Sequence, residues 1–432
     1  MHSFSYRKGK LFCEGVSVQS LAEKYGTPLY IYSKETISRH FRELDTALGS
    51  LDHRICYAVK ANSNLAVLRV LANLGAGFDI VSEGELSRVL AAGGDPDRCI
   101  FAGVGKTERE IELALRKKIH CFNAESLPEL ERINRVAARL KKQAPVAVRI
   151  NPNVDAHTHA KITTGTYENK FGIQFEHVEE VYAKAAKLRN LRLRGVQMHI
   201  GSQLTDVAPF EAAVRKALPM VRELAGKYSL ELFSIGGGLG IDYKPALASG
   251  SADWWSTPEG SAIMTPATYA RRLTPLLAPL ELKLFIEPGR FIVGNAGILV
   301  TRVEYVKQTG RKNFVIVDAA MNDLIRPAFY DSYHEIVPLA QRNGALVSSD
   351  VVGPICESAD YFCKDRLMPK VGEGDYVALM SAGAYSFAMS SNYNSRAMSA
   401  EILVDGSRAA EVRTRQRLSD VWATEKIPAW LK

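Results

Sequence analysis

The stretch Ile55-Cys56-Tyr57-Ala58-Val59-Lys60-Ala61-Asn62 decides how the rest of the chain is interpreted. It is an apolar run, typical of a buried strand, that carries one lysine at its carboxyl end. A lysine just beyond such a strand, beneath an enclosing site, loses solvation, so its neutral form becomes accessible. A neutral amine can form a Schiff base with an aldehyde cofactor. The alternative, which is commoner for a lysine in isolation, is a side chain that extends from the strand to the surface.

Length and composition favour a soluble globular protein. The chain has 432 residues, more than one ordinary core accommodates, so we expect about two domains. The net charge is +8, but the basic residues are scattered, which favours solvated helix faces over a nucleic-acid site. No apolar stretch approaches a membrane span, and the start MHSFSYRKGK lacks an apolar signal core. We therefore expect a cytoplasmic protein with no membrane and no nucleic-acid partner.

Short strand-like runs alternate with helix-like segments through most of the chain. The runs cover residues 54–60, 77–82, 99–104, 119–124, 146–151, 193–201, 231–236 and 283–287. Alternation of this kind predicts a parallel sheet in an α/β protein. Eight units in about 250 residues match a closed (β/α)8 TIM-like barrel better than a doubly wound sheet, which is the alternative.

A second domain is predicted after about residue 294, where strand-like runs follow one another with few helical patterns between them. We expect a barrel domain over residues 34–293 and a mainly β domain over 294–432, completed by strands from 1–33. The longest connection, residues 241–265, has the composition of a surface loop or lid. Its adjacent Trp254 and Trp255 are expected to pack against another domain or a partner.

The six cysteines show no CxxC pairing and no histidine at metal-ligand spacing. We therefore expect free thiols and no metal site. Cys56, Cys99 and Cys121 lie in apolar runs, which is typical of small core residues.

The carboxyl ends of parallel barrel strands open onto one face, where catalytic residues usually lie. On this prediction one face gathers the residues Lys60, Asp79, Arg149, His199, Ser202, the run Gly236-Gly237-Gly238-Leu239-Gly240, Glu287, Gly289 and Arg290. Four glycines in five residues leave room for backbone N–H groups to converge on a phosphate. Position after the seventh strand favours that interpretation over a simple turn, because this barrel often binds phosphate there.

Glu287 lies in the apolar run Phe285-Ile286-Glu287-Pro288, where a carboxylate requires a partner. A protonated pyridine nitrogen would be such a partner, and an ion pair with Arg290 or Arg149 is the alternative. His199 is expected either to stack on a flat cofactor or to be a hydrogen-bonded core histidine. An aldehyde-reactive lysine, a phosphate site and a carboxylate for a ring nitrogen together indicate pyridoxal 5'-phosphate.

With these motifs the chain resembles the alanine-racemase-like group of pyridoxal-phosphate enzymes, most closely its barrel-type decarboxylases that act on diaminopimelate. The resemblance covers nearly the whole chain. It rests on the motifs YAVKAN (57–62), FDIVSEGEL (78–86), RINPNVDAHTHAKITTG (149–165), NKFGI (169–173), HIGSQ (199–203), GGGLG (236–240), EPGR (287–290), CESAD (356–360) and GAY (383–385).

The resemblance implies a role for each matching residue. Lys60 would form the Schiff base and His199 would stack on the ring. Glu287 would meet the ring nitrogen, and Cys356, from the other subunit, would be the proton donor. The phosphate would be held by Ser202, Gly237, Gly238 and Gly240, with Tyr385 assisting. The matches to substrate-binding positions are Arg290, Arg326, Tyr330, Glu357 and Tyr385. Asp79, Arg149 and Gly289 complete the expected cofactor site.

The resemblance also implies a homodimer with shared active sites and the decarboxylation of meso-2,6-diaminopimelate to L-lysine and carbon dioxide. The far end of that substrate carries an amine and a carboxylate, which suit Glu357 and Arg326. A related decarboxylase for ornithine, arginine or carboxynorspermidine remains an alternative, as do an amino-acid racemase and a non-catalytic homologue. An arginine at the far end would repel the basic amino acids.

Overall fold

The computed structural model describes residues 1–154 and 170–431. They form two compact units, each with its own core. The barrel unit comprises residues 37–241 and 262–292, and the β unit comprises residues 1–36, 242–261 and 293–432. Most of the motif at 149–165 lies outside the described residues. None of the helices in the described part is both long and apolar enough to cross a membrane.

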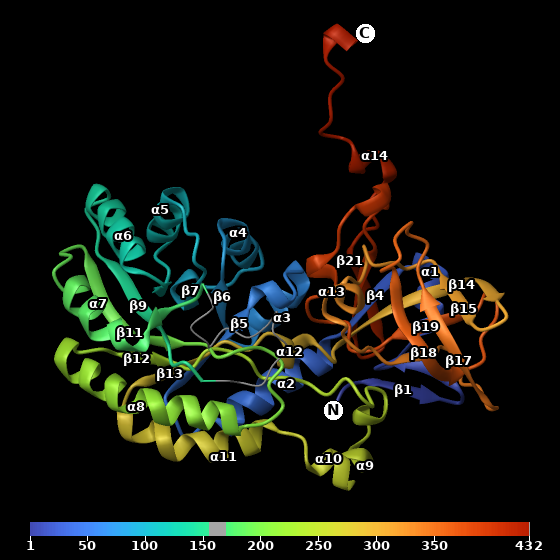
Figure 1. The fold of residues 1–432 in the computed structure, drawn as a ribbon, viewed down its shortest axis with the longest axis horizontal. Helices are drawn as coiled ribbons and strands as arrows, with labels where there is room; N and C mark the ends of the chain where they lie inside the picture. Colours follow the sequence, from blue (N-terminus) through green and yellow to red (C-terminus); the bar gives the residue numbers. More distant parts are fainter. Residues whose placement is uncertain (155–169, 432) are drawn as a thin grey trace. The chain divides into compact units, whose positions relative to one another are not determined.

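The barrel unit is a closed parallel barrel surrounded by helices (Figure 1). Its eight strands are β5 (His53–Ala58), β6 (Gly77–Ile80), β7 (Cys99–Phe101), β8 (Cys121–Ala124), β9 (Ala144–Asn151), β11 (Leu191–Met198), β12 (Leu232–Ser234) and β13 (Lys283–Ile286). Consecutive strands pair in parallel, and β13 pairs with β5, which closes the ring. The short β10 (Ile173–Gln174) lies outside this ring beside β9. The predicted fold class and all eight predicted strands are therefore confirmed.

Several of the helices around the barrel begin with side-chain caps that the sequence supplies. The helices are α2 (Lys34–Ala47), α3 (Leu65–Asn73), α4 (Glu83–Ala91), α5 (Glu108–Lys117), α6 (Leu127–Arg139), α7 (Val178–Ala185), α8 (Ala208–Tyr228), α11 (Pro266–Leu277) and α12 (Arg290–Val293). Asn64 accepts from the Ala66 amide at 2.9 Å, and Thr107 forms a capping box with Glu110. Such caps satisfy amides that lack a partner within the helix, so each capped helix starts at a defined residue.

The barrel interior is filled by small and aromatic side chains from alternating positions of its strands. One fully buried cluster consists of Cys56, Ile100, Cys121, Ala147, Leu232 and Phe285. These residues come from six different strands, so a single layer ties the ring together. The six cysteines are free thiols, and Cys56, Cys99 and Cys121 are buried as predicted.

The β unit is built on a mixed sheet. In order, its strands are β18 (Tyr361–Pro369), β17 (Leu346–Val352), β15 (Asn313–Val317), β14 (Gly297–Gln308), β4 (Leu29–Ser33), β20 (Ala400–Asp405) and β21 (Arg408–Arg413). β19 (Tyr376–Leu379) pairs with both β14 and β16 (Ile336–Pro338). A separate small sheet contains β1 (Phe4–Arg7), β2 (Lys10–Cys13) and β3 (Val16–Ser17).

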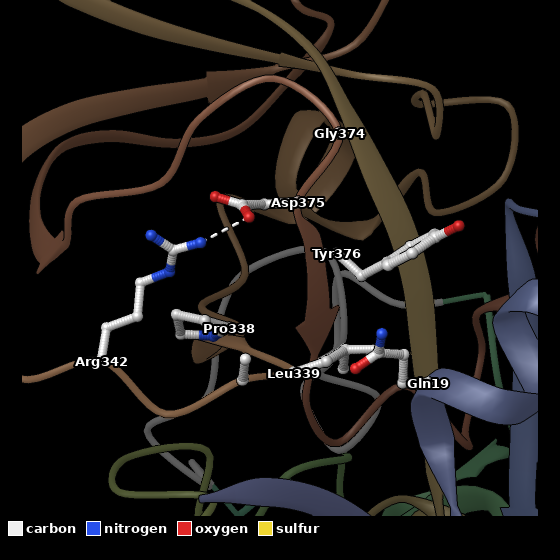
Figure 2. Close-up of a pocket in the computed structure, with 8 residues that line it drawn as sticks. Gln19, Pro338, Leu339, Arg342, Gly374, Asp375 and Tyr376 are labelled. Atoms are coloured by element: carbon white, nitrogen blue, oxygen red, sulfur yellow. Dashed lines mark hydrogen bonds and ion pairs between the residues drawn. The ribbon is translucent and has the colours of Figure 1, made fainter.

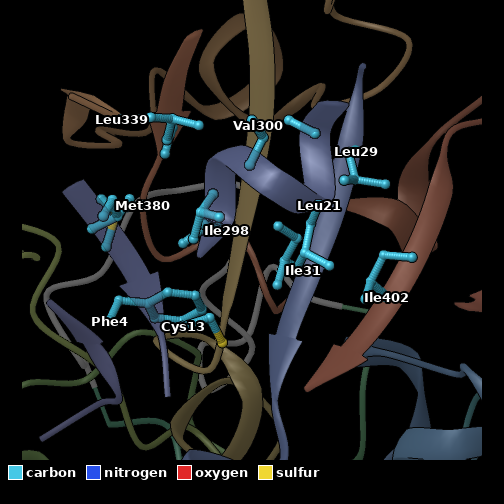
Figure 3. Close-up of a cluster of buried hydrophobic side chains, with 14 of the residues drawn as sticks. Phe4, Cys13, Leu21, Leu29, Ile31, Ile298, Val300, Leu339, Met380 and Ile402 are labelled. Carbon is cyan, nitrogen blue, oxygen red and sulfur yellow. The ribbon is translucent and has the colours of Figure 1, made fainter. Parts of the chain in front are cut away.

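One apolar core joins the two sheets of the β unit (Figure 3). Leu29 and Ile31 of β4 pack with Ile298 and Val300 of β14, and Phe4 packs against the same cluster from the small sheet. β4 lies between β14 and β20, which are far from it in sequence. The amino-terminal segment is therefore a central strand of this sheet.

The structure differs from the sequence analysis in two segments of the β unit. Residues 18–25 form a helix, α1 (Val18–Tyr25), where only strands were expected; Ser17 caps it, and its eight residues are too short for a clear helical period. Residues 242–261 contain η4 (Ala248–Gly250), α9 (Ala252–Trp255) and α10 (Pro258–Ser261) and group with the β unit. Trp254 and Trp255 lie edge to face at 5.0 Å, and the Trp255 indole donates to the Ser249 carbonyl at 2.8 Å.

The remaining helices are short. They are η1 (Val59–Ala61), η2 (Pro96–Arg98), η3 (Phe175–His177), η5 (Ala278–Leu280), α13 (Arg326–Tyr330), η6 (Phe387–Met389), η7 (Tyr393–Ser395), α14 (Leu418–Val421) and η8 (Ala429–Leu431).

Candidate active site

Lys60 and Asp79 form an ion pair at the carboxyl ends of β5 and β6. Lys60 lies in η1, directly after β5, and its Nζ donates to Asp79 Oδ2 at 2.9 Å. The register aligns Ala58 with Asp79, so the two side chains meet where the strands end. Asp79 is fully buried, and within the described residues its Oδ1 has no hydrogen-bond partner. A buried oxygen without a hydrogen bond costs free energy of folding, and such oxygens are often found where a ligand binds.

Glu287 follows β13, which is the other neighbour of β5. Lys60, Asp79 and Glu287 therefore come from three consecutive strands of the ring. The carboxylate of Glu287 accepts hydrogen bonds from Ser234 Oγ at 2.7 Å, Gln197 Nε2 at 3.1 Å and Asn123 Nδ2 at 3.4 Å.

Burial, with a smaller contribution from Asp79, raises the pKa of Glu287 to about 7. The same pKa is lowered by Ser234, which donates a hydrogen bond, and by the charge of Lys60. The hydrogen bonds to Glu287 therefore favour its charged form, whereas burial favours its protonated form. A protonated ring nitrogen beside Glu287 would supply the missing positive charge.

His199 follows β11 and is held in the neutral form. Burial lowers its pKa well below the usual range, and the charges of Arg149 and Lys60 lower it further. The Gly237 amide donates to His199 Nδ1 at 3.2 Å, which assigns the ring proton to Nε2. A neutral imidazole with a fixed plane is suited to stacking on an aromatic cofactor.

The glycine run after β12 packs so closely that no side chain would fit. A Cβ on Gly237 would lie 2.2 Å from the Glu287 carbonyl oxygen, and one on Gly238 would lie 2.6 Å from that of Gly201. Gly238 also has φ +105°, a conformation that favours glycine. The Gly240 amide donates to the Leu204 carbonyl at 2.8 Å, so it and the Gly237 amide already have partners inside the protein.

Ser202 and Arg290 add a hydroxyl and a cation beside the glycine run. Arg290 Nη2 donates to Ser202 Oγ at 3.0 Å, which joins the ends of β11 and β13. The adjacent Gly289 packs against β5, where an added Cβ would lie 2.9 Å from that of Ala61. A hydroxyl and a guanidinium at this point suit a phosphate.

Arg149, in β9, is anchored by a carboxylate that the sequence analysis did not single out. Its Nη1 donates to Glu125 Oε1 at 3.0 Å, and both side chains are buried. Glu125 Oε2 accepts from the Gly172 amide at 3.0 Å, and the guanidinium lies 4.7 Å from the Phe171 ring centre. The contacts with Glu125, after β8, and with Phe171, before β10, therefore fix the side chain of Arg149.

The other predicted residues belong to the β unit, which we describe by itself. Arg326 is buried on α13, and Tyr330 is half-buried at the end of the same helix. Cys356 and Glu357 are exposed in the turn before β18. Tyr385 has φ +56°, a strained value for a tyrosine that is often found at functional sites.

Sequence reasoning missed the polar side chains that hold the predicted residues. Asn123, Gln197 and Ser234 point into the barrel from three strands and converge on Glu287. Asn123 and Ser234 are each the single polar residue of a short apolar strand, and Gln197 lies between Val196 and Met198 in β11. A polar residue in such apolar surroundings is the signal that would have found them. The same criterion would not have found Glu125, which lies beyond the end of β8.

A separate cavity of about 120 Å³ in the β unit contains none of the predicted site residues (Figure 2). Its walls include Gln19, Leu339 and Tyr376, and Arg342 and Asp375 form an ion pair there. No group of three or more His, Cys, Asp or Glu in residues 1–154 and 170–431 could hold a metal ion.

The barrel residues fit pyridoxal phosphate. The amine of Lys60 is part-exposed and lies beside Asp79, whose buried Oδ1 has no hydrogen-bond partner in the described residues. Burial disfavours the charged form of Glu287, which a nearby positive charge would stabilise. Ser202 and Arg290 offer phosphate ligands, and the glycine run excludes side chains from the same region.

Comparison with known proteins agrees with this chemistry. Residues 34–294 match the model of the pyridoxal-dependent decarboxylase family, pyridoxal binding domain. The chain is 50% identical to the diaminopimelate decarboxylases of Vibrio cholerae, over 430 residues, and Pseudomonas aeruginosa, over 428 residues, with 99% of each chain covered.

Among solved structures, diaminopimelate decarboxylase from Helicobacter pylori in complex with L-lysine is 39% identical, with a TM-score of 0.87 and coverage of 94% of this chain and 98% of that one. Family model, relatives and site geometry lead to one assignment. This chain belongs to the pyridoxal-dependent decarboxylase family.

Proposed function

We propose that this protein is a carboxy-lyase that converts meso-2,6-diaminopimelate to L-lysine and carbon dioxide, the last step of lysine biosynthesis. The observation that carries the chemistry is the placement of Lys60, Asp79 and Glu287 on three consecutive barrel strands. The substrate follows from the full-length similarity to relatives that bear the name diaminopimelate decarboxylase.

The barrel unit would hold pyridoxal phosphate with one set of residues at the ring and another at the phosphate. Lys60 would bind its aldehyde, and Glu287 would face its ring nitrogen. Ser202, Gly238 and Arg290 would contact the phosphate, and His199 would lie against the ring. Bound pyridoxal phosphate supplies an electron-withdrawing ring that accepts the electron pair left when carbon dioxide departs. Glu287 would keep that ring protonated.

Asp79 would hold the ammonium form of Lys60 whenever the lysine is released from the cofactor. The pair at 2.9 Å gives the lysine a fixed resting position beside the reacting atoms. A base that returns to the same place after each turnover needs such an anchor.

Cys356 would deliver the proton to the carbon that loses carbon dioxide. Its thiol is exposed. A donor must be shielded from water during the reaction, so an exposed thiol requires a covering surface. We propose that a second copy of the chain supplies that surface, in a homodimer with shared active sites.

Apolar side chains near the carboxyl terminus support an assembly. Large exposed side chains there are Leu418, Trp422, Ile427, Trp430 and Leu431. Trp430 alone is 81% exposed. Exposed apolar groups at this density are typical of a protein interface.

The far end of the substrate would be recognised by charge. Arg326 would bind its carboxylate and Glu357 its ammonium group, while Tyr330 and Tyr385 would line the pocket. Arg290 would contribute a second cation from the barrel. Ornithine and arginine lack the far carboxylate, so a buried arginine at that point disfavours them.

We also propose a cytoplasmic location and a barrel domain over residues 34–293, as the sequence analysis predicts. Free thiols at all six cysteines support a reducing compartment.

The test is release of carbon dioxide by the cofactor-loaded enzyme from meso-diaminopimelate, ornithine and arginine at equal concentrations. We expect release from meso-diaminopimelate at least 100-fold faster than from the others, on the order of the loss when a buried charged partner is unpaired. Faster release from ornithine or arginine would overturn the substrate assignment and leave the cofactor chemistry standing.

A further inference from the structure

Arg326 is a buried cation whose orientation is set by its neighbours in the β unit. It is only 5% exposed at the start of α13. A buried guanidinium binds a carboxylate well only if its plane is fixed before the ligand arrives, because the fork has one good geometry. Neighbouring side chains of the β unit fix that plane.

His334 provides the most specific contact. Arg326 Nε donates to His334 Nε2 at 3.3 Å, and His334 Nδ1 lies 2.8 Å from the Met380 carbonyl oxygen. A carbonyl can only accept, so the ring proton is on Nδ1 and Nε2 presents its lone pair to Arg326. The imidazole is therefore neutral, and it is completely buried.

The backbone around His334 makes this contact rigid. Its carbonyl oxygen accepts from Arg366, and the Met380 amide donates to the Glu335 carbonyl at 2.8 Å. The latter bond extends the pairing of β16 with β19. The imidazole thus projects from a hydrogen-bonded segment just before β16, and its Nε2 holds the arginine side chain in place.

Two further side chains contact the guanidinium of Arg326. The ring centre of Tyr243 lies 5.2 Å from the guanidinium carbon and 5.4 Å from the His334 ring, edge to face with the latter. Ser332 Oγ lies 3.2 Å from Arg326 Nη2. These contacts hold the guanidinium in one plane.

We propose that His334 is a positioning residue that selects substrates with a carboxylate at the far end, by holding Arg326 as an oriented donor. The inference rests on the proposed function, in which Arg326 binds that carboxylate. His334 itself does not contact substrate. Its contribution is an acceptor at Nε2, and an ammonium or methyl at the far end of a ligand gains nothing from it.

The test compares His334→Leu with His334→Gln in the cofactor-loaded enzyme. Leucine fills the space without an acceptor. In the glutamine variant, the side-chain oxygen can replace Nε2 as the acceptor for Arg326, and only the hydrogen bond to the Met380 carbonyl is lost. We expect the KM for meso-diaminopimelate to rise about tenfold or more in H334L, a factor that corresponds to about 1.4 kcal/mol, and less than threefold in H334Q. The kcat should change less than the KM in both variants.

Ligand binding separates positioning from general damage. L-Lysine keeps an amine and a carboxylate at one end, and 1,5-diaminopentane lacks the carboxylate. The inhibition constant of L-lysine should rise in H334L by the same factor as the KM, while that of 1,5-diaminopentane stays within twofold. An equal loss for both ligands, or equal values in H334L and H334Q, would overturn the proposal.

A second pair of variants covers the case in which H334L does not fold. His334→Asn and H334Q are both amides, but only the longer side chain reaches Arg326, so H334N should show the higher KM. Equal KM values in this pair would also contradict the inference. If the unmodified enzyme does not decarboxylate meso-diaminopimelate, the proposed function has failed instead.

Discussion

Glu287 shows how one residue's surroundings set its chemistry. Replacement by glutamine keeps its size and removes the negative charge that would face the ring nitrogen. We expect Glu287→Gln to lower turnover by about 100-fold, as losses of a single electrostatic contact in an active site do. Turnover and cofactor retention on dialysis are the measurements. Glu231→Gln is the matched control. Glu231 directly precedes β12, at the opposite end of the strand from the site, so its replacement should leave turnover and cofactor retention unchanged.

The raised pKa of Glu287 also predicts a pH dependence for the cofactor-free protein. In the folded state this pKa is about 7, against an ordinary value of 4.5, so the native state keeps a proton that the unfolded chain releases. The free energy of unfolding should therefore fall as pH rises from 4.5 to 7, by at most about 1.4 kcal/mol per pH unit from this group.

Urea unfolding of the unmodified protein and of E287Q across this range checks the slope. Burial raises the pKa of Glu85 to about 7 as well, so only the difference between the two proteins reports on Glu287. Parallel curves would contradict the predicted pH dependence.

At the scale of elements, the glycine run after β12 depends on close packing between neighbouring strand ends. Gly238→Ala places a Cβ 2.6 Å from the Gly201 carbonyl in a backbone with φ +105°, so the run must shift. We expect the Kd for pyridoxal phosphate to rise at least about tenfold, since a displaced backbone loses more than one phosphate contact. Titration of cofactor absorbance measures it.

Gly226→Ala is the control for the glycine run. Gly226 lies in α8, and an added Cβ would meet nothing within 4 Å. This change should stabilise the protein by about 0.5–1 kcal/mol through helix propensity and leave the Kd unchanged. A Kd that rises equally in both variants would show that the run has no special role.

For the whole molecule, shared active sites predict that two inactive variants complement each other. Lys60→Ala and Cys356→Ala should each abolish most turnover, and C356A should keep its cofactor. In a mixed dimer one site receives both substitutions and the other receives neither. After subunit exchange, turnover should recover to about one quarter of the unmodified value, because half of the dimers are mixed and each has one intact site. No recovery after verified exchange would place Lys60 and Cys356 of each site on the same chain.

The sequence by itself determined the barrel and the cofactor, and it predicted which residues would react. Alternating apolar runs specify strands and helices locally, and the rule that parallel strand ends share a face brings Lys60, Asp79 and Glu287 together without coordinates. The glycine run was recognisable because glycine has a local conformational reason to be there. The eight-residue helix α1 was not, because two turns leave too few apolar positions to show a period.

Only the tertiary structure decided what holds those residues in place. Glu287 is held by Asn123, Gln197 and Ser234 from three other strands, and His334 meets Met380, 46 positions further along the chain. Such contacts depend on strand register and on which elements become neighbours, and neither is encoded in the residues next to each partner. A local pattern therefore identifies a reactive side chain, whereas its orientation and charge state come from distant residues that folding brings beside it.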